Sequence, residues 1–223
     1  MRWVAVEKQQ PVIIVGAGGH AVSVAESVLA CGYELLGFLE DEPAKSSLLG
    51  RPVYSHPPAA HGTEGARLVI AVGDNYAREG LWRRFVVASQ SALAPALIHP
   101  SASVSASATI GAGSVILQGA IVGSCARIGN LCIVNSGAVV EHECEMQDFA
   151  SLAPKAAIGG RVRIGERSAI SIGAVVKPGI AIGHDTVVGA QSYVNDNLPA
   201  NVVAYGIPAR VVRTRESSDS YLR

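Results

Sequence analysis

A histidine flanked by two glutamates stands in the C-terminal half of the chain. His142 follows Glu141 and precedes Glu143. An imidazole has an ordinary pKa near neutrality, so it can take up and release a proton at physiological pH. With carboxylates beside it, such a group suits general-base catalysis. We therefore expect His142 to be a general base; the alternative is a solvent-exposed histidine in a turn.

Two further positions are linked to His142 by their spacing. Gly160 lies eighteen residues after it, and Asn135 lies seven residues before it. If the fold repeats every eighteen residues, Gly160 occupies the same corner one coil further along, about 5 Å away. A glycine there leaves its N–H open to a ligand, as the oxyanion hole of an acyl transfer requires. Asn135 falls in the preceding corner, where it could hydrogen-bond a substrate.

A glycine-rich turn near the N-terminus suits phosphate binding. Its glycines are Gly16, Gly18 and Gly19. They separate an apolar run over residues 11–15, expected to be a strand, from a helical pattern over residues 19–30. Glycines let the backbone approach a phosphate, and the N-terminus of the helix offers free N–H groups. The acidic pair Glu40 and Asp41 ends the second predicted strand, where folds of this kind contact a ribose or a base.

The size of this N-terminal region limits what it can bind. Its turn satisfies the GxGxxA pattern of NAD-binding domains, but such a match is weak by itself. A strand over residues 67–73, a helix over 75–88 and a strand over 92–98 complete a region of about 95 residues. That is about half of a dinucleotide-binding fold. We therefore expect a mononucleotide or nucleotide-sugar site; the alternative is a tight strand–helix turn without a ligand.

A six-residue repeat supplies the elements that must position His142 and Gly160. An aliphatic residue or Met stands at every sixth position from Val104 to Val194, with a mostly small residue two places before each. Neither a helix nor a flat strand has this period, which is typical of a β-helix. Three sides make a coil of eighteen residues, and the chain holds about five coils. Glycine often follows the aliphatic residue, and we expect it to turn the corner with a positive φ.

Composition excludes several classes of partner. The chain has 18 basic and 18 acidic residues and no net charge, which argues against nucleic acid and anionic membranes. Residues 1–10 lack the apolar core of a signal peptide, and no run is apolar and long enough to span a membrane. None of the four cysteines forms a CxxC pair, and Cys132 and Cys144 fall on inward positions. These features predict a cytoplasmic protein.

Five motifs together resemble the nucleotide-sugar branch of the hexapeptide-repeat acyltransferases. They are VIIVGAGGH at 12–20, GFLEDEP at 37–43, IHPSA at 98–102, HEC at 142–144 and GIPAR at 206–210. This branch is the sialic-acid O-acetyltransferase-like group, which includes the UDP-4-amino-sugar and GDP-perosamine N-acetyltransferases. The resemblance covers residues 11–212. It implies a Rossmann-like half domain over residues 1–98, a left-handed parallel β-helix over 99–212 and a polar tail over 213–223, which we expect to be mobile.

The resemblance also implies roles for individual residues. It makes His142 the general base, Glu143 the residue that orients and polarises it, and the Gly160 N–H the group that binds the thioester oxygen. Residues that would contact the nucleotide sugar are Gly16, Gly18, Gly19, His20, Asp41, Gly73 and Asn75. Some relatives carry a second histidine nine residues after the base, where this chain has Ser151.

The resemblance implies acetyl-CoA as co-substrate and a homotrimer with its active sites between subunits. Acetyl-CoA would lie in the groove between two prisms, along the turn backbone at Ala174 and Ala190. Arg210 would lie near its phosphates.

The predicted activity is an acetyl-CoA-dependent N-acetyltransferase acting on a nucleotide-linked amino sugar. One alternative is O-acetylation of a free sugar such as sialic acid, and another is a non-catalytic nucleotide-binding trimer. A zinc enzyme on the same scaffold would need three converging imidazoles. His142 and His184 are 42 residues apart, which is not a multiple of eighteen, so they cannot share a corner. We therefore expect no metal.

Overall fold

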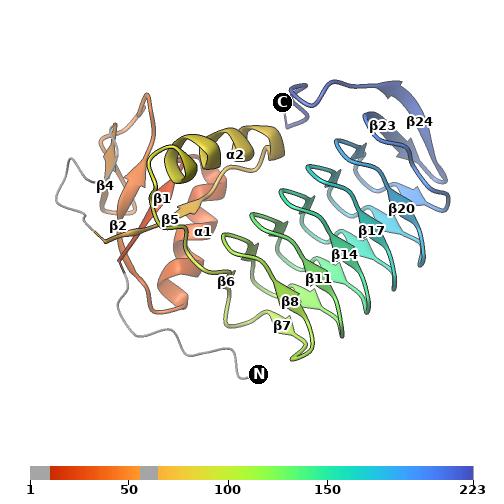
Figure 1. Ribbon diagram of the computed structural model, residues 1–223, viewed down its shortest axis with the longest axis horizontal. Helices are drawn as coiled ribbons and strands as arrows, with labels where there is room; N and C mark the ends of the chain where they lie inside the picture. The colour runs from red at the N-terminus through yellow and green to blue at the C-terminus, as the bar shows by residue number, and fades with distance from the viewer. Residues whose placement is uncertain (1–10, 56–64, 223) are drawn as a thin grey trace.

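The computed structural model describes residues 11–55 and 65–222, and the prediction made for residues 1–10 lies outside this part of the chain. Figure 1 shows an α/β region packed against one end and one side of a long three-sided prism. Within the described residues, no helix is long and apolar enough to cross a membrane. The structure confirms the predicted order of the two regions, an α/β half domain followed by a parallel β-helix.

The N-terminal region is a five-stranded sheet in the order β3-β4-β2-β1-β5, with β1 parallel to β2 and β5. Its strands are β1 (Pro11–Val15), β2 (Glu34–Leu39), β3 (Ser47–Leu48), β4 (Arg51–Tyr54) and β5 (Arg67–Ile70). Its helices are α1 (Gly19–Ala30) and α2 (Asn75–Trp82), which continues into the π-helical segment η2 (Arg83–Val87). The βαβ unit of β1, α1 and β2 is the predicted one, because a buried apolar strand leads through the glycine-rich turn into an amphipathic helix. The short strands β3 and β4 match no predicted element.

The prism has three faces, each a stack of short parallel strands. One face, here called the covered face, holds β6 (Leu97–Ile98), β9 (Val115–Ile116), β12 (Ile133–Val134), β15 (Ser151–Leu152), β18 (Ala169–Ile170), β21 (Val187–Val188), β23 (Val202–Gly206) and, antiparallel at its end, β24 (Ala209–Thr214). The apolar face holds β7 (Ser103–Val104), β10 (Ile121–Val122), β13 (Val139–Val140), β16 (Ala157–Ile158), β19 (Val175–Val176) and β22 (Tyr193–Val194). The charged face holds β8 (Thr109–Ile110), β11 (Arg127–Ile128), β14 (Glu145–Met146), β17 (Arg163–Ile164) and β20 (Ala181–Ile182).

Burial follows the predicted six-residue period. Val140 pairs with Ile158 eighteen residues later, and both side chains lie in the prism core. The small residues two places before them, Ala138 and Ala156, are fully buried in the same core. Removing this apolar surface from water is the main favourable contribution to folding.

The last strand predicted for the α/β region belongs to the prism instead. Only Leu97 and Ile98 of residues 92–98 form a strand, and they pair with β9. Leu97 faces the core shared with the N-terminal sheet, and Ile98 packs on the prism core. The repeat therefore begins one step before Val104, and β6 is common to both regions.

The expected role of the glycines that follow the aliphatic residues is wrong. None of them has a positive φ; that conformation occurs two residues later, as at Arg161, which follows Gly159 and has φ +61°. These glycines are required by close approach between coils. A Cβ on Gly123 would lie 2.8 Å from the His142 backbone nitrogen, and one on Gly165 would lie 2.5 Å from that of His184. No real Cβ contact is that short.

The outward positions of the three faces differ in polarity. The covered face packs Val115 and Ile133 into a core shared with the N-terminal sheet. The apolar face leaves Ile121 and Val175 exposed, at 45% and 43%. The charged face carries Glu145 paired with Arg127 and Arg163. We name the corner between the covered and apolar faces the Asn135 corner, that between the apolar and charged faces the His142 corner, and the third the α2 corner.

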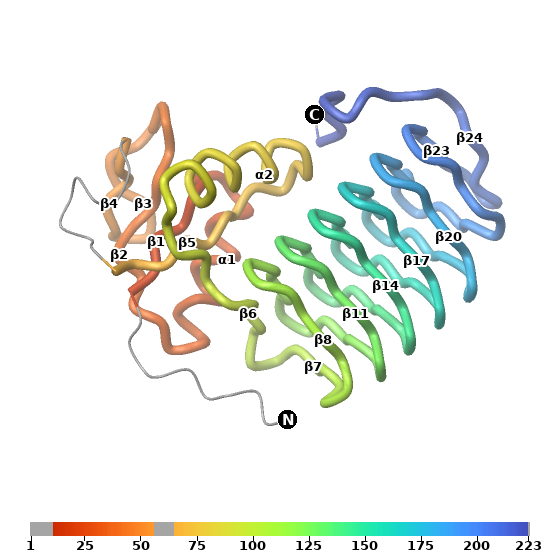
Figure 2. Tube along the Cα trace, viewed as in Figure 1, coloured from red at the N-terminus to blue at the C-terminus, as the bar shows by residue number. Residues whose placement is uncertain are grey.

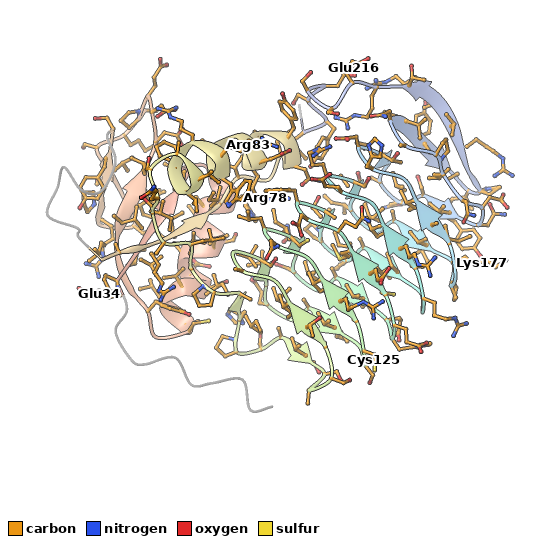
Figure 3. The ribbon with its side chains drawn as sticks, viewed as in Figure 1. Glu34, Arg78, Arg83, Cys125, Lys177 and Glu216 are labelled. Carbon is orange, nitrogen blue, oxygen red and sulfur yellow. The ribbon has the colours of Figure 1, made fainter. Side chains whose placement is uncertain are left out.

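A buried arginine joins α2 to the prism (Figure 3). Arg78 is fully buried, and its Nε donates to the Leu131 carbonyl at 2.8 Å and its Nη2 to the Phe149 carbonyl at 2.6 Å. The same guanidinium donates to the Val72 carbonyl at 2.9 Å and to Asn75 Oδ1 at 2.7 Å. A guanidinium has five N–H donors in a fixed fork, so one side chain can hold several carbonyls of two domains in place.

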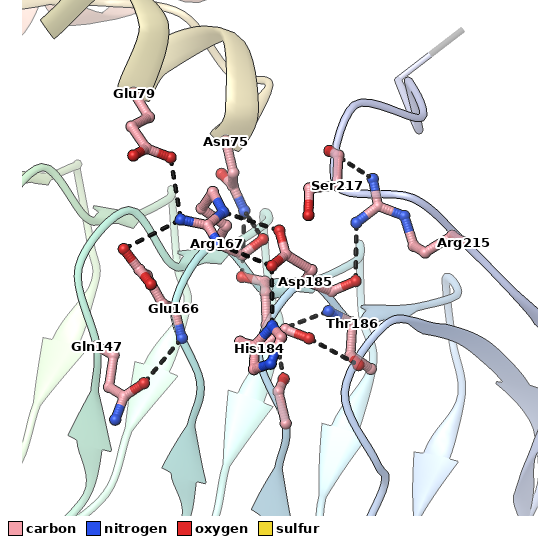
Figure 4. Close-up of polar contacts among 12 residues, drawn as sticks. Asn75, Glu79, Gln147, Glu166, Arg167, His184, Asp185, Thr186, Arg215 and Ser217 are labelled. Carbon is pink, nitrogen blue, oxygen red and sulfur yellow. Dashed lines mark hydrogen bonds and ion pairs between the residues drawn. The ribbon is translucent and has the colours of Figure 1, made fainter. Parts of the chain in front are cut away.

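Ion pairs extend this interface between α2 and the prism along the α2 corner (Figure 4). Arg167 bonds Glu79 of α2 at 3.0 Å and the buried Asp185 at 2.8 Å. Burial raises the pKa of Asp185, but hydrogen bonds from Arg167 and His184 outweigh it, and the net shift is downward. The carboxylate of Asp185 is thus charged at neutral pH and fixes Arg167 toward α2.

The C-terminal tail is not the free segment expected. Figure 2 shows it leaving the far end of the prism and returning toward α2. Its first residues belong to β24, Arg215 is only 6% exposed, and Tyr221 bonds Asn75 of α2. The tail is held because its few large side chains find buried partners on both parts of the molecule.

Candidate active site

His142 projects from its corner with one ring nitrogen engaged. Its side chain is 51% exposed, and Nδ1 lies 3.2 Å from Glu143 Oε2. Glu143 also lies 3.7 Å from Arg161 Nη1. With Nδ1–H donated to the carboxylate, Nε2 carries the lone pair that a general base needs. The geometry therefore suits the expected division of roles between His142 and Glu143.

Gly160 lies directly beside the imidazole. A Cβ at this position would be 2.4 Å from His142 Nε2, so a side chain here would displace the ring from its present position. The coils stack here through the Arg161 N–H, which donates to the His142 carbonyl at 2.9 Å. The Gly160 N–H donates to no other group in the part of the chain that the structure describes. A base and an unused backbone donor are thus neighbours on one corner.

Asn135 lies on a different corner, beside a cavity that we call the larger cavity. This cavity has a volume of about 370 Å³ and lies between the N-terminal region and the prism. His20 and Gly73 line it from the N-terminal region, and Asn135, Ser151 and Ala190 line it from the prism. Its floor is largely apolar, formed by Ile133, Leu152, Ala169 and Ile170. It has the size of a small-ligand site.

His20 brings a neutral imidazole to this cavity. It lies in the first turn of α1, and its Nε2 is buried without a hydrogen-bond partner among the described residues. Burial, reinforced by the positive charge of Arg78, lowers the pKa of His20 to about 4. An unpaired buried polar atom is costly. The imidazole is therefore poised to bond a ligand that enters the cavity.

The glycine-rich turn borders a second cavity of about 220 Å³. Ala17 and Gly18 line it together with Glu40 and Lys45. Gly18 is the N-cap of α1, and the first turn of that helix carries no acidic residue of its own. Gly19 is exposed on the same turn.

Of the acidic pair at the end of β2, Glu40 rather than Asp41 faces the turn. The Ala17 N–H donates to Glu40 Oε2 at 2.8 Å. Asp41 instead pairs with Arg84 at 2.5 Å on the exposed surface. Gly16 has φ +109°, and a Cβ there would lie 3.0 Å from the Ala71 carbonyl oxygen. Gly16 is therefore required by the packing of β1 against the end of β5.

Asn75 lies in the interface between the N-terminal region and the prism and does not border the larger cavity. It is 1% exposed, and its Nδ2 donates to the Arg167 carbonyl at 2.9 Å. Its Oδ1 accepts from Arg78. Both ends of the amide are therefore occupied, and only Gly73 of this predicted pair borders the cavity.

The residues expected along the CoA path fall on two corners. Ala190 is exposed on the Asn135 corner, whereas Ala174 is buried there and its N–H donates to the Ser171 carbonyl at 3.1 Å. Arg210 extends from β24 to Asn195 and Asp196, at the far end of the His142 corner. Ala190 and Arg210 thus border the two edges of the apolar face.

A single chain does not bring the predicted groups into one site. His142 and Gly160 lie on one edge of the apolar face, whereas Asn135 and the larger cavity lie at the other edge. The glycine-rich turn borders the second cavity, apart from both edges.

The sequence prediction of the site missed several lining residues of the larger cavity, among them Ser151, Tyr221 and Leu222. From the sequence alone, Ser151 stands out only as the position where some relatives have a histidine. Its outward position on β15 follows from the repeat. Tyr221 and Leu222 also line the cavity, and no period or motif marks them. Their place depends on the path of the tail.

Comparison with known proteins gives matches along nearly the whole chain. The family model described as the PglD N-terminal domain matches residues 11–85. A variant of the GDP-perosamine N-acetyl transferase from Caulobacter crescentus, solved with CoA and GDP-perosamine, is 37% identical, has a TM-score of 0.85, and covers 91% of this chain and 97% of its own. The acetyltransferase domain of PglB from Neisseria gonorrhoeae, solved with acetyl coenzyme A, is 33% identical, has a TM-score of 0.83, and covers 92% of this chain and 100% of its own.

Matches to curated relatives are shorter. The UDP-N-acetylbacillosamine N-acetyltransferase of Bacillus subtilis is 40% identical over 100 residues, which is 42% of this chain and 45% of that protein. The chain thus spans less than half the length of the curated relatives that it matches.

Proposed function

The chain belongs to the hexapeptide-repeat nucleotide-sugar N-acetyltransferases, and we propose that it transfers an acetyl group from acetyl-CoA to the amine of a nucleotide-linked amino sugar. The observation that carries this is the pairing of His142 with Gly160. A general base and a backbone N–H lie together on one corner, with Glu143 behind the base. Related structures that hold CoA with GDP-perosamine, or acetyl coenzyme A, support the same pair of substrates.

The proposed reaction is a direct acyl transfer. The sugar amine attacks the thioester carbonyl carbon, a C–N bond forms, and the negative charge that develops on the oxygen is stabilised by the Gly160 N–H. His142 Nε2 takes the proton that the amine loses, while Glu143 stabilises the imidazolium. The C–S bond then breaks, and the proton passes to the departing sulfur to give free CoA.

We assign the nucleotide sugar to the N-terminal region. Gly18 and Gly19 at the start of α1 would approach the phosphates with their backbone, as helix N-termini do. The smaller cavity beside Glu40 suits the nucleoside, and the larger cavity, with His20 and Asn135, suits the sugar. Asp41 stays a candidate through its carboxylate, although its ion pair with Arg84 would have to open.

We propose a homotrimer that completes the site. Ile121, Val175 and Tyr193 make an apolar stripe on a face that no other described part of the chain covers. Cyclic packing of such a face closes a ring of identical contacts. His142 of one copy would then act on a sugar held beside Asn135 of the next. CoA would run along the groove between them, past Ala190, with Arg210 toward its phosphates; Ala174 would contribute only by shaping the corner.

The test is release of CoA thiol from acetyl-CoA with a panel of UDP-, GDP- and dTDP-linked amino sugars. The matched control for each is the nucleotide sugar with a hydroxyl in place of the amine. We expect rapid thiol release, and an N-acetylated product by mass spectrometry, with at least one amino sugar and not with its control. Release with free sugars alone would point to O-acetylation, and nucleotide binding without any release would point to a non-catalytic trimer.

A further inference from the structure

The last residues of the chain are anchored by a buried arginine. Arg215 Nη1 donates to the Asp185 carbonyl at 2.8 Å, as Figure 4 shows. Its Nη2 donates to the Asp219 carbonyl at 2.6 Å. Its guanidinium also lies 5.8 Å from the centre of the Tyr221 ring. Hydrogen bonds from a charged donor are stronger than those from a neutral one. The tail is therefore held in a defined path across the α2 corner.

This path ends at the larger cavity. The Tyr221 hydroxyl donates to the Gly73 carbonyl at 3.3 Å and accepts from the Asn75 N–H at 3.2 Å. Ser151, on the prism, lines the same cavity. Burial raises the pKa of Tyr221, so the hydroxyl stays protonated. Tyr221 thus ties the tail to the wall of the cavity that the N-terminal region forms.

Leu222 extends the same wall. Its Cδ1 lies 3.2 Å from the position that a Cβ on Gly73 would take, and its side chain lines the cavity. A volume of about 370 Å³ remains with the tail in place. Small-ligand sites start at about 300 Å³, so the tail leaves room for a sugar ring and is a wall of the pocket, not a plug.

From these contacts we propose that the C-terminal segment is part of the acceptor site. The Tyr221 ring and the Leu222 side chain pack against the sugar of the nucleotide-linked substrate, opposite His20 and Asn135. This rests on the proposed function, which identifies the larger cavity as the sugar site. The Tyr221 hydroxyl acts indirectly, because its hydrogen bonds with Gly73 and Asn75 already hold the tail in place.

The test compares Tyr221→Ala, Tyr221→Phe and Leu222→Ala with the wild-type enzyme. The matched control is Tyr76→Ala, which removes a tyrosine that is 49% exposed on α2. We expect Tyr221→Ala to raise the KM for the amino-sugar substrate about tenfold, because an aromatic wall is lost. Leu222→Ala should raise it about threefold, and Tyr221→Phe should keep most of the wild-type value. The KM for acetyl-CoA should not change in any variant.

Two results would overturn the proposal while the wild type is active. One is an acceptor KM that Tyr221→Ala changes no more than Tyr76→Ala does. The other is an equal rise in both KM values together with a lower melting temperature, as a purely structural role would give. A wild type that releases no thiol with any acceptor overturns the proposed function and this inference with it.

Discussion

His142 and His184 are a natural pair for testing single-residue chemistry. Both project from corners, at 51% and 53% side-chain exposure, and each has a carboxylate of the next residue near Nδ1. Only His142 has an unused backbone N–H beside its other nitrogen, at Gly160. The two histidines therefore differ in their surroundings: Gly160 lies beside His142, whereas the carboxylate beside His184 is buried and paired with Arg167.

We predict that His142→Ala lowers turnover by about 10²–10⁴, which is the usual loss when a general base is removed. The fold should survive, because the side chain is half exposed and packs on no core residue. Thiol release and circular dichroism would measure the two effects. His184→Ala is the control and should keep nearly full activity. If His142→Ala keeps a turnover within a few-fold of wild type, His142 is not the general base.

His20 makes a prediction about pH. Its pKa is lowered by burial, and secondarily by Arg78, to about 4, whereas in the unfolded chain it lies near 6.5. Between these values the unfolded chain binds a proton that the native chain does not. The free energy of unfolding is therefore not reduced by His20 above about pH 6.5. It falls as the pH drops toward 4, by on the order of 3 kcal/mol in all. His20→Gln should reduce this fall, measured by thermal unfolding at about pH 7 and pH 4.5; an identical fall in both proteins would contradict it.

Among the elements, the glycine-rich turn and the start of α1 should serve the nucleotide. A side chain at Gly18 meets no atom within 4 Å, so Gly18→Val should leave the melting temperature nearly unchanged. It should weaken binding of the nucleotide sugar about ten- to a hundredfold, because the backbone no longer reaches the phosphate. Calorimetric titration would measure this, with CoA affinity unaffected. Gly80→Val, also free of contacts, is the control; equal loss of both ligands would count against the assignment.

The interface between α2 and the prism depends on the guanidinium of Arg78. Arg78→Met should lower the free energy of unfolding by about 3 kcal/mol or more, because the Leu131 and Phe149 carbonyls lose a charged donor. Arg83→Met is the matched control, since that side chain is 69% exposed and bonds only Glu79. Denaturant unfolding of both variants is the measurement, and equal stability of the two would show that the interface does not depend on Arg78.

At the scale of the whole molecule, the apolar face should hold copies together. Ala157 stands outward on this face, and Ala181 stands at an equivalent outward position on the charged face. Ala157→Glu would bury a charge without a partner in the interface and should dissociate the trimer. Ala181→Glu should leave it intact. Sedimentation at micromolar concentration should give about three times 23.0 kDa for the wild type and the control. A stable monomeric wild type with full activity would refute the trimer.

The architecture of this protein was open to prediction from the sequence alone. A strict six-residue period admits one kind of structure, because inward side chains must stack once per coil. The same period related His142 to Gly160, since residues eighteen apart share a corner. The strand–turn–helix start was equally visible, because a short apolar run and a glycine-rich turn are local signals.

Only the tertiary structure decided the contacts among the N-terminal region, the prism and the C-terminal tail, whose sequences follow different patterns. Asn75 points into the interface between α2 and the prism because Arg78 and the Arg167 carbonyl are there to bond it. Tyr221 reaches the larger cavity because Arg215 finds the carbonyl of Asp185. Such contacts join residues far apart in the chain, and no local period encodes them. The repeat determined which residues share a corner of the prism, and only packing determined what each corner faces.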